Sequence, residues 1–289
     1  MRNLPCELLQ IVASYSDNLP VLVLVNKHIH RCLTPILYRR IDVSVESNTK
    51  ALLNTLRESR ALRKHPQVFY TTLQIHLMFG HSERHCAVLG EVLMLTPNII
   101  EISLNFVFSN AQVIWKRTGY PFQLQTLGVS GVSKDFFSTD FAQTQKAVEH
   151  LDLSLPSNSR LRKLQSFVVA PEPEVFPKLK SVRGMRALVQ HILPGRPISS
   201  VSLWDTIEKK ALPSFVEALS ETTAPLEFLH VGLGMSPNSW YKRIPAFFSD
   251  ISYAHGSLRT LKLWFYPPNR DLDSAPLDPE SVYVFLQVT

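Results

Sequence analysis

The sequence contains few cysteines and glycines and has no long apolar run. Its 289 residues include three cysteines and ten glycines. Cys6, Cys32 and Cys86 are an odd number at irregular spacing, which favours reduced thiols in an intracellular protein over a disulfide scaffold. No stretch reaches the ~20 uncharged apolar residues of a membrane span. The first residues lack the apolar core of a signal peptide, so we expect a cytoplasmic or nuclear protein.

Catalytic motifs are also missing. The glycines form neither of the phosphate-binding patterns GxxxxGK and GxGxxG, and the nucleophile motif Gly-x-Ser-x-Gly is absent. Two groups have spacings worth weighing as metal ligands: His81, His85 and Cys86, and His28, His30 and Cys32. The first lacks a further ligand, and the second alternates around a presumed helix, so structural or surface roles are favoured. We therefore predict that the protein is not an enzyme and uses no cofactor and no metal.

The net charge of +6 is concentrated near the N-terminus. Residues 1–70 hold ten Lys and Arg against five Asp and Glu, and the remainder holds twenty against nineteen. The overall composition, 45% hydrophobic and 19% charged, is that of an ordinary globular protein. A basic helix could contact nucleic acid, but no base-reading motif accompanies it, and an acidic protein partner or a solvated helical face fits as well.

The opening segment, Leu4 to Ile41, has a large aliphatic residue at nearly every third or fourth position. Read as a helix, Glu7 to Tyr15 places several of these residues on one stripe. So short a segment rarely builds an adequate core without disulfides, metal or a partner. Neither cross-link is evident in the sequence, so we expect the surplus apolar surface to be covered by the rest of the chain or by another protein.

From about residue 67 a pattern of apolar and variable positions recurs, in the order apolar, two variable, apolar, one variable, apolar. Copies begin at Tyr70, Ile99, Leu124, Val148, Leu164, Ile198, Leu226 and Leu258, with a degenerate one at Leu179. The alternation within each copy predicts a strand, and helix-like segments separate several copies. Strand–helix units repeated in parallel form a solenoid. Between Leu151 and Val182 the steps are too short for a helix. The competing architecture is an ordinary α/β domain with a mixed sheet.

The variable positions of each predicted strand point away from the core. We predict that target binding uses such positions: His76, Asn105, Asp152, Trp204, His230 and Trp264. Exposed tryptophans are over-represented at binding hot spots, although either tryptophan could instead pack under a loop as a core residue. An apolar run at 282–286 indicates either an incomplete sequence or a strand that packs back onto the last repeat.

The N-terminal residues, taken in order, resemble a known motif. Its parts are Leu4, Pro5, Glu7, Leu8, Leu9 and Ile11, then Leu22 and Leu24 to Lys27, and finally Leu37, Tyr38 and Ile41. This set resembles an F-box, the helical motif that docks onto the Skp adaptor of cullin–RING ubiquitin ligases, as in fungal F-box-like proteins. The repeats resemble the irregular leucine-rich-repeat regions that often follow an F-box. The resemblance implies these adaptor-binding residues: Leu4, Pro5, Glu7, Leu8, Leu9, Ile11, Leu22, Val25 and Leu37.

We therefore predict an α/β protein with a short N-terminal helical F-box-like module at 1–45 and a linker helix at 46–66. An irregular leucine-rich-repeat-like solenoid with parallel strands would follow at 67–289. The resemblance implies a substrate-receptor subunit of an SCF-type ligase that binds the Skp-type adaptor and an unknown target protein. From the sequence we expect no membrane association, and we do not expect nucleic acid as a partner. Two alternatives stay open. The repeats could be a scaffold for protein or nucleic acid without any ligase connection, and the opening helices could be a small cap on the following domain.

Overall fold

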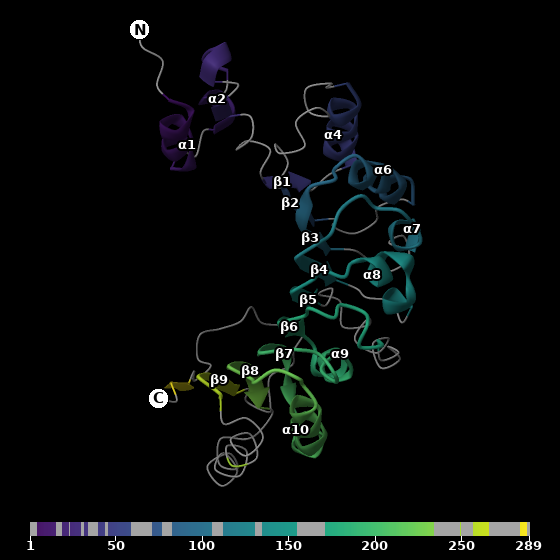
Figure 1. Ribbon diagram of the computed structural model, residues 1–289, viewed down its shortest axis with the longest axis vertical. Coiled ribbons are helices and arrows are strands. Elements are labelled where there is room, and N and C mark those ends of the chain that lie inside the picture. The colour runs from purple at the N-terminus through teal and green to yellow at the C-terminus, as the bar shows by residue number, and fades with distance from the viewer. Residues whose placement is uncertain are drawn as a thin grey trace. The chain divides into compact units, whose positions relative to one another are not determined.

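The computed structural model describes fourteen stretches of the chain: 5–15, 19–22, 24–29, 32–33, 40–43, 46–58, 71–76, 83–105, 112–130, 135–154, 171–233, 249, 257–265 and 284–287. The chain divides into two compact units, Met1–Leu124 and Gln125–Thr289, and each is treated separately here (Figure 1). The division lies inside the predicted repeat region, and the predicted boundaries at residues 45 and 66 stay predictions. No described helix is long and apolar enough to cross a membrane.

The first unit begins with short helices. These are α1 (Cys6–Ser14) and α2 (Leu19–Leu22), followed by helical residues at 27–29 and 32–33. Pro5 precedes α1, and its carbonyl accepts the first helical hydrogen bond, from the Leu9 N–H at 3.1 Å. Proline is tolerated there because a helix start leaves its N–H groups without intrahelical partners. Glu7 lies in the first turn, where a negative charge stabilises the helix dipole.

The rest of the first unit alternates strands and helices. Its strands are β1 (Arg40–Val43), β2 (Thr71–His76) and β3 (Ile99–Asn105), and its helices are α4 (Glu46–Glu58), α6 (Glu83–Met94) and α7 (Gln112–Trp115). β2 pairs in parallel with both β1 and β3. The three helices lie on one side of these strands (Figure 1). The sequence predicted β2 and β3, whereas β1 was not expected.

The second unit contains six parallel strands that pair in the order of the sequence. They are β4 (Thr126–Ser130), β5 (His150–Ser154), β6 (Ser181–Gly184), β7 (Ser200–Ile207), β8 (Phe228–Leu233) and β9 (Thr260–Phe265). Between them lie η2 (Phe136–Ser138), α8 (Asp140–Thr144), α9 (Arg186–Ile192), η4 (Lys209–Ala211) and α10 (Leu212–Ser220). The predicted α/β class with parallel strands is thus confirmed. The copy that begins at Leu164 lies outside the described residues.

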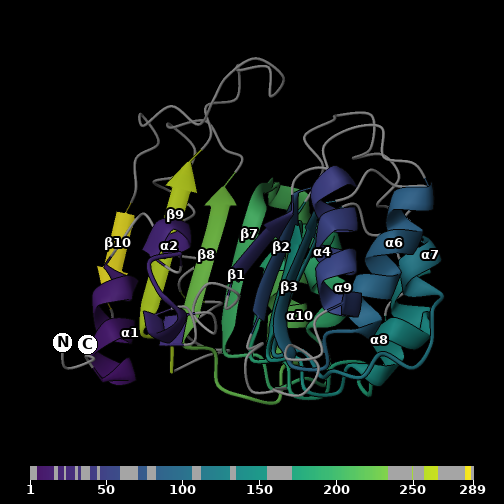
Figure 2. The same cartoon turned by 90° about the horizontal axis from the view of Figure 1, so that it is seen from above.

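The apolar run near the C-terminus forms a strand. β10 (Val284–Gln287) pairs antiparallel with β9 (Figure 2). The interpretation of this run as a strand on the last repeat is therefore confirmed. In register, Leu286 lies opposite Leu261 and Val284 lies opposite Leu263.

The core of the second unit consists of rows of aliphatic side chains, one from each strand. The first row aligns in register across β4 to β9: Leu127, Leu151, Val182, Val201, Leu229 and Leu261. Each member of this row is at most 2% exposed. A single strand would leave its apolar face uncovered. In the sheet, the aliphatic side chains of the neighbouring strands cover this face along the row. This is why the pattern recurs in the sequence at every strand.

A turn-rich segment, 171–180, precedes β6 and contains no helix, as the short steps in the sequence predicted for this interval. The Arg196 side chain is 1% exposed and holds the segment against the end of α9. Its guanidinium donates to five backbone carbonyls, those of Pro171, Glu172, Val175, Ile192 and Pro194. Burial lowers the pKa of Arg196 to about 10, so it is still charged at neutral pH. Phe176 is buried in the core, and its backbone lies in the left-handed region at φ 57°.

Candidate functional site

The first candidate surface is formed by apolar residues of the N-terminal helices. Seven large hydrophobic side chains there are between 49% and 87% exposed: Leu8, Ile11, Val12, Tyr15, Val21, Leu24 and Val25. We call these seven the N-terminal apolar set. Elsewhere in the described chain, the exposed large hydrophobics are Leu95 at 39% and Trp204 at 41%. Leu8, Ile11, Val12 and Tyr15 occupy positions i, i+3, i+4 and i+7 of α1 and its C-terminal cap, so they lie on one helical face. The described residues do not cover this surface.

The opposite side of α1 faces a small internal cluster. Ala13 and Leu33 are buried there, and Leu9, Leu22 and Ile29 pack against them. The predicted adaptor-binding residues are therefore divided between two environments. Leu8, Ile11 and Val25 belong to the exposed set, Pro5 and Glu7 are exposed beside it, and Leu9 and Leu22 contribute to the internal cluster. Leu4 and Leu37 lie outside the described residues.

The second candidate surface is the face of the parallel strands opposite the core in the second unit. Polar side chains align there in register across β5 to β9: Asp152, Arg183, Ser202, His230 and Lys262. We call these five the polar row. They alternate along each strand with the buried aliphatic residues, because successive strand residues point to opposite faces. The row therefore follows from the same periodicity that builds the core.

Members of the polar row contact one another and nearby aromatic rings. An Asp152 carboxylate oxygen lies 4.0 Å from the Arg183 guanidinium, and the Cζ atom of Arg183 lies 3.5 Å from the centre of the Trp204 ring. This second distance is that of a cation–π contact. The Ser202 hydroxyl and the Nδ1 atom of His230 are 3.1 Å apart. These contacts fix the side chains on an otherwise open face.

Burial controls the charges of the row. It raises the pKa of Asp152, and the Arg183 charge and a hydrogen bond from Trp204 oppose that rise without cancelling it. The Oδ1 atom of Asp152 is buried and accepts no hydrogen bond from the described residues. Burial lowers the pKa of His230, and the charges of Lys262 and Arg183 lower it further. The row thus combines two basic side chains with an imidazole whose pKa is lowered and a carboxyl group whose pKa is raised and whose Oδ1 atom accepts no hydrogen bond from the described residues.

The two predicted tryptophans differ in their surroundings. Trp204 is 41% exposed and lies against Arg183. Trp264 is half-buried, and its ring lies directly over Gly232 on the neighbouring strand, where an added Cβ would come within 2.4 Å of the ring. Glycine at 232 therefore gives the indole the room to lie flat on β8.

The six predicted target-binding residues belong to two different units of the chain. Asp152, Trp204, His230 and Trp264 lie on the polar face of the second unit, whereas His76 and Asn105 are opposite each other in the register of β2 and β3 in the first. The side chains of His76 and Asn105 lie outside the described parts. Arg183 was not among the predicted residues. It lies beside the buried Val182, and the same alternation of buried and exposed positions identified Asp152.

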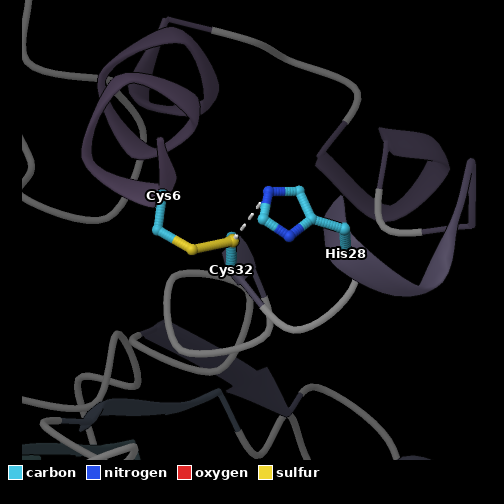
Figure 3. Close-up of side chains that lie close together, drawn as sticks. All are labelled: Cys6, His28 and Cys32. Atoms are coloured by element: carbon cyan, nitrogen blue, oxygen red, sulfur yellow. Dashed lines mark hydrogen bonds between the residues drawn. A yellow bond between two sulfur atoms is a disulfide. The ribbon is translucent and has the colours of Figure 1, made fainter. Parts of the chain in front are cut away.

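The cysteines are arranged differently from the expectation of three reduced thiols. Cys6 and Cys32 form a disulfide with their Cα atoms 5.1 Å apart, whereas Cys86 is buried outside it. The earlier expectation is wrong for this pair, because helical folding brings together two residues that are 26 apart in sequence. The Nε2 atom of His28 lies 3.8 Å from the Cys32 sulfur (Figure 3).

In the other histidine group of the sequence, the structure describes His85 and Cys86. His85 is fully buried, and its Nε2 atom lies 2.7 Å from the hydroxyl of Thr49 on α4. His81 lies outside the described residues. His85 thus contributes to the buried contact between α4 and α6.

Comparison with known proteins provides no family assignment. No protein-family model matches the chain, and no curated protein matches its sequence.

Proposed function

We propose that the chain is a substrate-receptor subunit of an SCF-type cullin–RING ubiquitin ligase. In this proposal the N-terminal helices bind a Skp-type adaptor, and the strand-lined face of an irregular leucine-rich-repeat-like solenoid holds a target protein. The observation that carries the proposal is the exposure of the N-terminal apolar set on helices that also bear the F-box-like residues. Contiguous exposed apolar surface marks interaction sites in folded proteins.

The energetics favour a partner that covers more than one helix. Full burial of a leucine-sized side chain contributes about 1.5–3 kcal/mol. Four such residues on α1 would contribute at most about 6–12 kcal/mol, which is comparable to the ~4–15 kcal/mol of freedom lost on association. Val21, Leu24 and Val25 on the next segment would supply the remainder. We therefore propose that the docking surface is built on both segments.

The polar row supports the target-binding half of the proposal. Arg183 and Lys262 attract carboxylates, and the unused Oδ1 acceptor of Asp152 suits a backbone or side-chain N–H donor. Trp204 adds an exposed aromatic surface beside them. We therefore propose that the target presents an acidic polypeptide segment to this face, and that the protein acts by positioning the target rather than by covalent chemistry.

Co-purification tests the adaptor half. The wild-type chain, expressed in cells, should bring down a Skp-type adaptor and a cullin. Leu8→Asp should abolish this binding, because it would bury an unpaired charge against the adaptor. Leu95→Asp is the matched control, since Leu95 is an exposed leucine outside the N-terminal apolar set, and this variant should bind like the wild type. A folded wild-type chain that recovers neither ligase subunit would contradict the proposal.

A second function follows if the cations of the polar row meet nucleic acid instead. The chain would then be a repeat scaffold without a ligase connection. Binding to RNA or DNA that weakens steeply with salt, and that is reduced by Arg183→Gln or Lys262→Gln, would favour this function. Retention of the ligase subunits by the same preparation would favour the first.

A further inference from the structure

Three metal-binding side chains converge in the N-terminal helices. The ligand atoms of Cys6, His28 and Cys32 all lie within 4.8 Å of one another. Cys6 is the first residue of α1, and the other two come from the helical residues at 27–29 and 32–33. Figure 3 shows the His28 ring aimed at the Cys32 sulfur. His28 and Cys32 are four residues apart, the spacing at which two side chains on a helix lie one turn apart.

The geometry at His28 fits a zinc ligand set. Zinc binds thiolate sulfur at about 2.3 Å and imidazole nitrogen at about 2.0–2.1 Å in a tetrahedron, which places neighbouring nitrogen and sulfur ligands about 3.6 Å apart. The Nε2 atom of His28 lies 3.8 Å from the Cys32 sulfur.

The N-terminal helices need a cross-link whether Cys6 and Cys32 are oxidised or reduced. Its internal cluster contains two buried residues, Ala13 and Leu33, with three partly buried ones around them. Helical units of this size rarely hold together on so small a core without a disulfide or a metal. When Cys6 and Cys32 are oxidised, their disulfide supplies that cross-link. When they are reduced, the same three side chains would be available to a metal ion, which would then supply the cross-link.

We propose that in the dithiol form Cys6, His28 and Cys32 bind one zinc ion. Both thiols lose a proton on binding, the imidazole binds through its unprotonated Nε2, and two protons are released to solvent with no change in oxidation state. Two thiolates and an imidazole favour zinc over magnesium or calcium, which take oxygen ligands. Three protein ligands leave the fourth tetrahedral position to water or to another group. The site does not depend on adaptor binding.

Metal titration of the full chain tests the site. The disulfide is first reduced with a phosphine: the S–S bond breaks, one water molecule supplies the oxygen of the phosphine oxide, and its two protons go to the two thiols. Cobalt(II), a spectroscopic substitute for zinc, is then added without oxygen. We expect one equivalent to give the visible absorption of a tetrahedral ion together with thiolate charge-transfer bands. One equivalent of zinc should abolish both signals.

Variants distinguish the metal site from a simple disulfide. His28→Ala keeps both thiols, and it should weaken zinc binding by more than about 100-fold, beyond the 10–100-fold typical of groups that only orient a ligand. After oxidation the same variant should still form the Cys6–Cys32 disulfide, detected by peptide mass spectrometry, which shows that the helices remain folded together. Cys6→Ser and Cys32→Ser should each remove charge-transfer intensity. Cys86→Ala, the matched control, should bind one equivalent like the wild type.

Three results would overturn the inference. These are no stoichiometric cobalt binding by the reduced wild-type chain, unchanged affinity in His28→Ala, or loss of binding in Cys86→Ala. Adaptor co-purification is measured separately, so a chain that recovers the adaptor but refuses the metal would defeat this inference alone. A chain that binds zinc but recovers no adaptor would defeat the proposed function alone.

Discussion

The N-terminal helices and the strands of the second unit differ in the exposure of their large aliphatic residues. In β4 to β9 the aliphatic row is at most 2% exposed, and polar side chains occupy the alternate positions. In α1 and the segment after it, large aliphatics lie on both sides of the helix, and those of the N-terminal apolar set are at least 49% exposed. The strands thus bury their aliphatic side chains against one another, whereas the helices leave many of theirs exposed.

The difference teaches what a repeated unit can do that a single short unit cannot. The apolar side chain of each strand packs beside that of the neighbouring strand, so the buried apolar surface grows with every strand that is added. In the described residues, the N-terminal helices are joined by the Cys6–Cys32 disulfide, and the N-terminal apolar set stays exposed. These helices therefore leave far more apolar surface exposed than the strands do.

Loss of the buried guanidinium should produce the largest effect on the strand side of this comparison. Arg196→Leu would leave up to five backbone carbonyls without their donor in a buried turn, and we expect a loss of about 3–5 kcal/mol in the free energy of unfolding. Chemical denaturation measures it. Arg183→Leu is the control at an exposed arginine and should cost at most about 1 kcal/mol. Equal losses in the two variants would contradict the assigned role of Arg196.

Leucine truncation breaks the comparison most directly. Leu229→Ala removes a fully buried side chain from the aliphatic row and should cost about 2–5 kcal/mol. Leu8→Ala removes an exposed side chain and should change the free energy of unfolding by about 0.5 kcal/mol or less. Denaturation midpoints of the isolated chain measure both. A large loss for Leu8→Ala would show that α1 uses this face to stabilise the chain itself.

The strands were predictable from sequence because their alternation is strict and recurs. Leu127, Val182 and Leu261 all appear in the sequence pattern and in one structural row. β1 was missed because a four-residue strand with two apolar positions gives almost no periodic signal beside the preceding helical pattern. The residues that meet across strands, such as Arg183 and Trp204, depend on register, which a single strand pattern does not reveal.

The N-terminal site was less predictable for a different reason. His28 and Cys32 have helical spacing, and this signal was present in the sequence. Cys6 reaches them only because α1 folds back onto the later helical residues, and no local pattern encodes that contact. Non-local pairing of this kind has no periodicity, so composition alone favoured unpaired thiols.

Substitution of Gly232 sharpens the comparison at the polar face. Gly232→Ala would place a Cβ within 2.4 Å of the Trp264 ring, and displacing the ring should cost about 1–3 kcal/mol. In a Trp264→Ala background the same change should cost much less, because the obstructing ring is gone. Denaturation of the four chains of this double-mutant cycle measures the coupling. Independent effects of the two changes would show that the indole does not rest on β8.

The smallest effect is expected at Asp152 and depends on pH. Its folded pKa is raised chiefly by burial, so its contribution to stability is present below the unfolded pKa, near 3.9, and is lost as pH rises through the folded pKa. The asparagine side chain of Asp152→Asn stays neutral. At neutral pH the free energy of unfolding of this variant should therefore exceed that of the wild type by at most about 1 kcal/mol, a limit set by solvent screening of this part-exposed side chain. The gain should vanish below about pH 4.

Glu149 provides a control of opposite sign on the same unit. Its pKa is lowered, chiefly by a hydrogen bond from Lys180, so Glu149→Gln should lose stability at neutral pH, and this loss should fade as pH falls through the folded pKa. Thermal unfolding of both variants across pH measures the two trends. If the stability differences of the two variants changed with pH in the same direction, this would contradict burial as the cause of the raised pKa of Asp152. Opposite trends would show that the polar face keeps a buried charge at a cost in stability, as sites selected for binding often do.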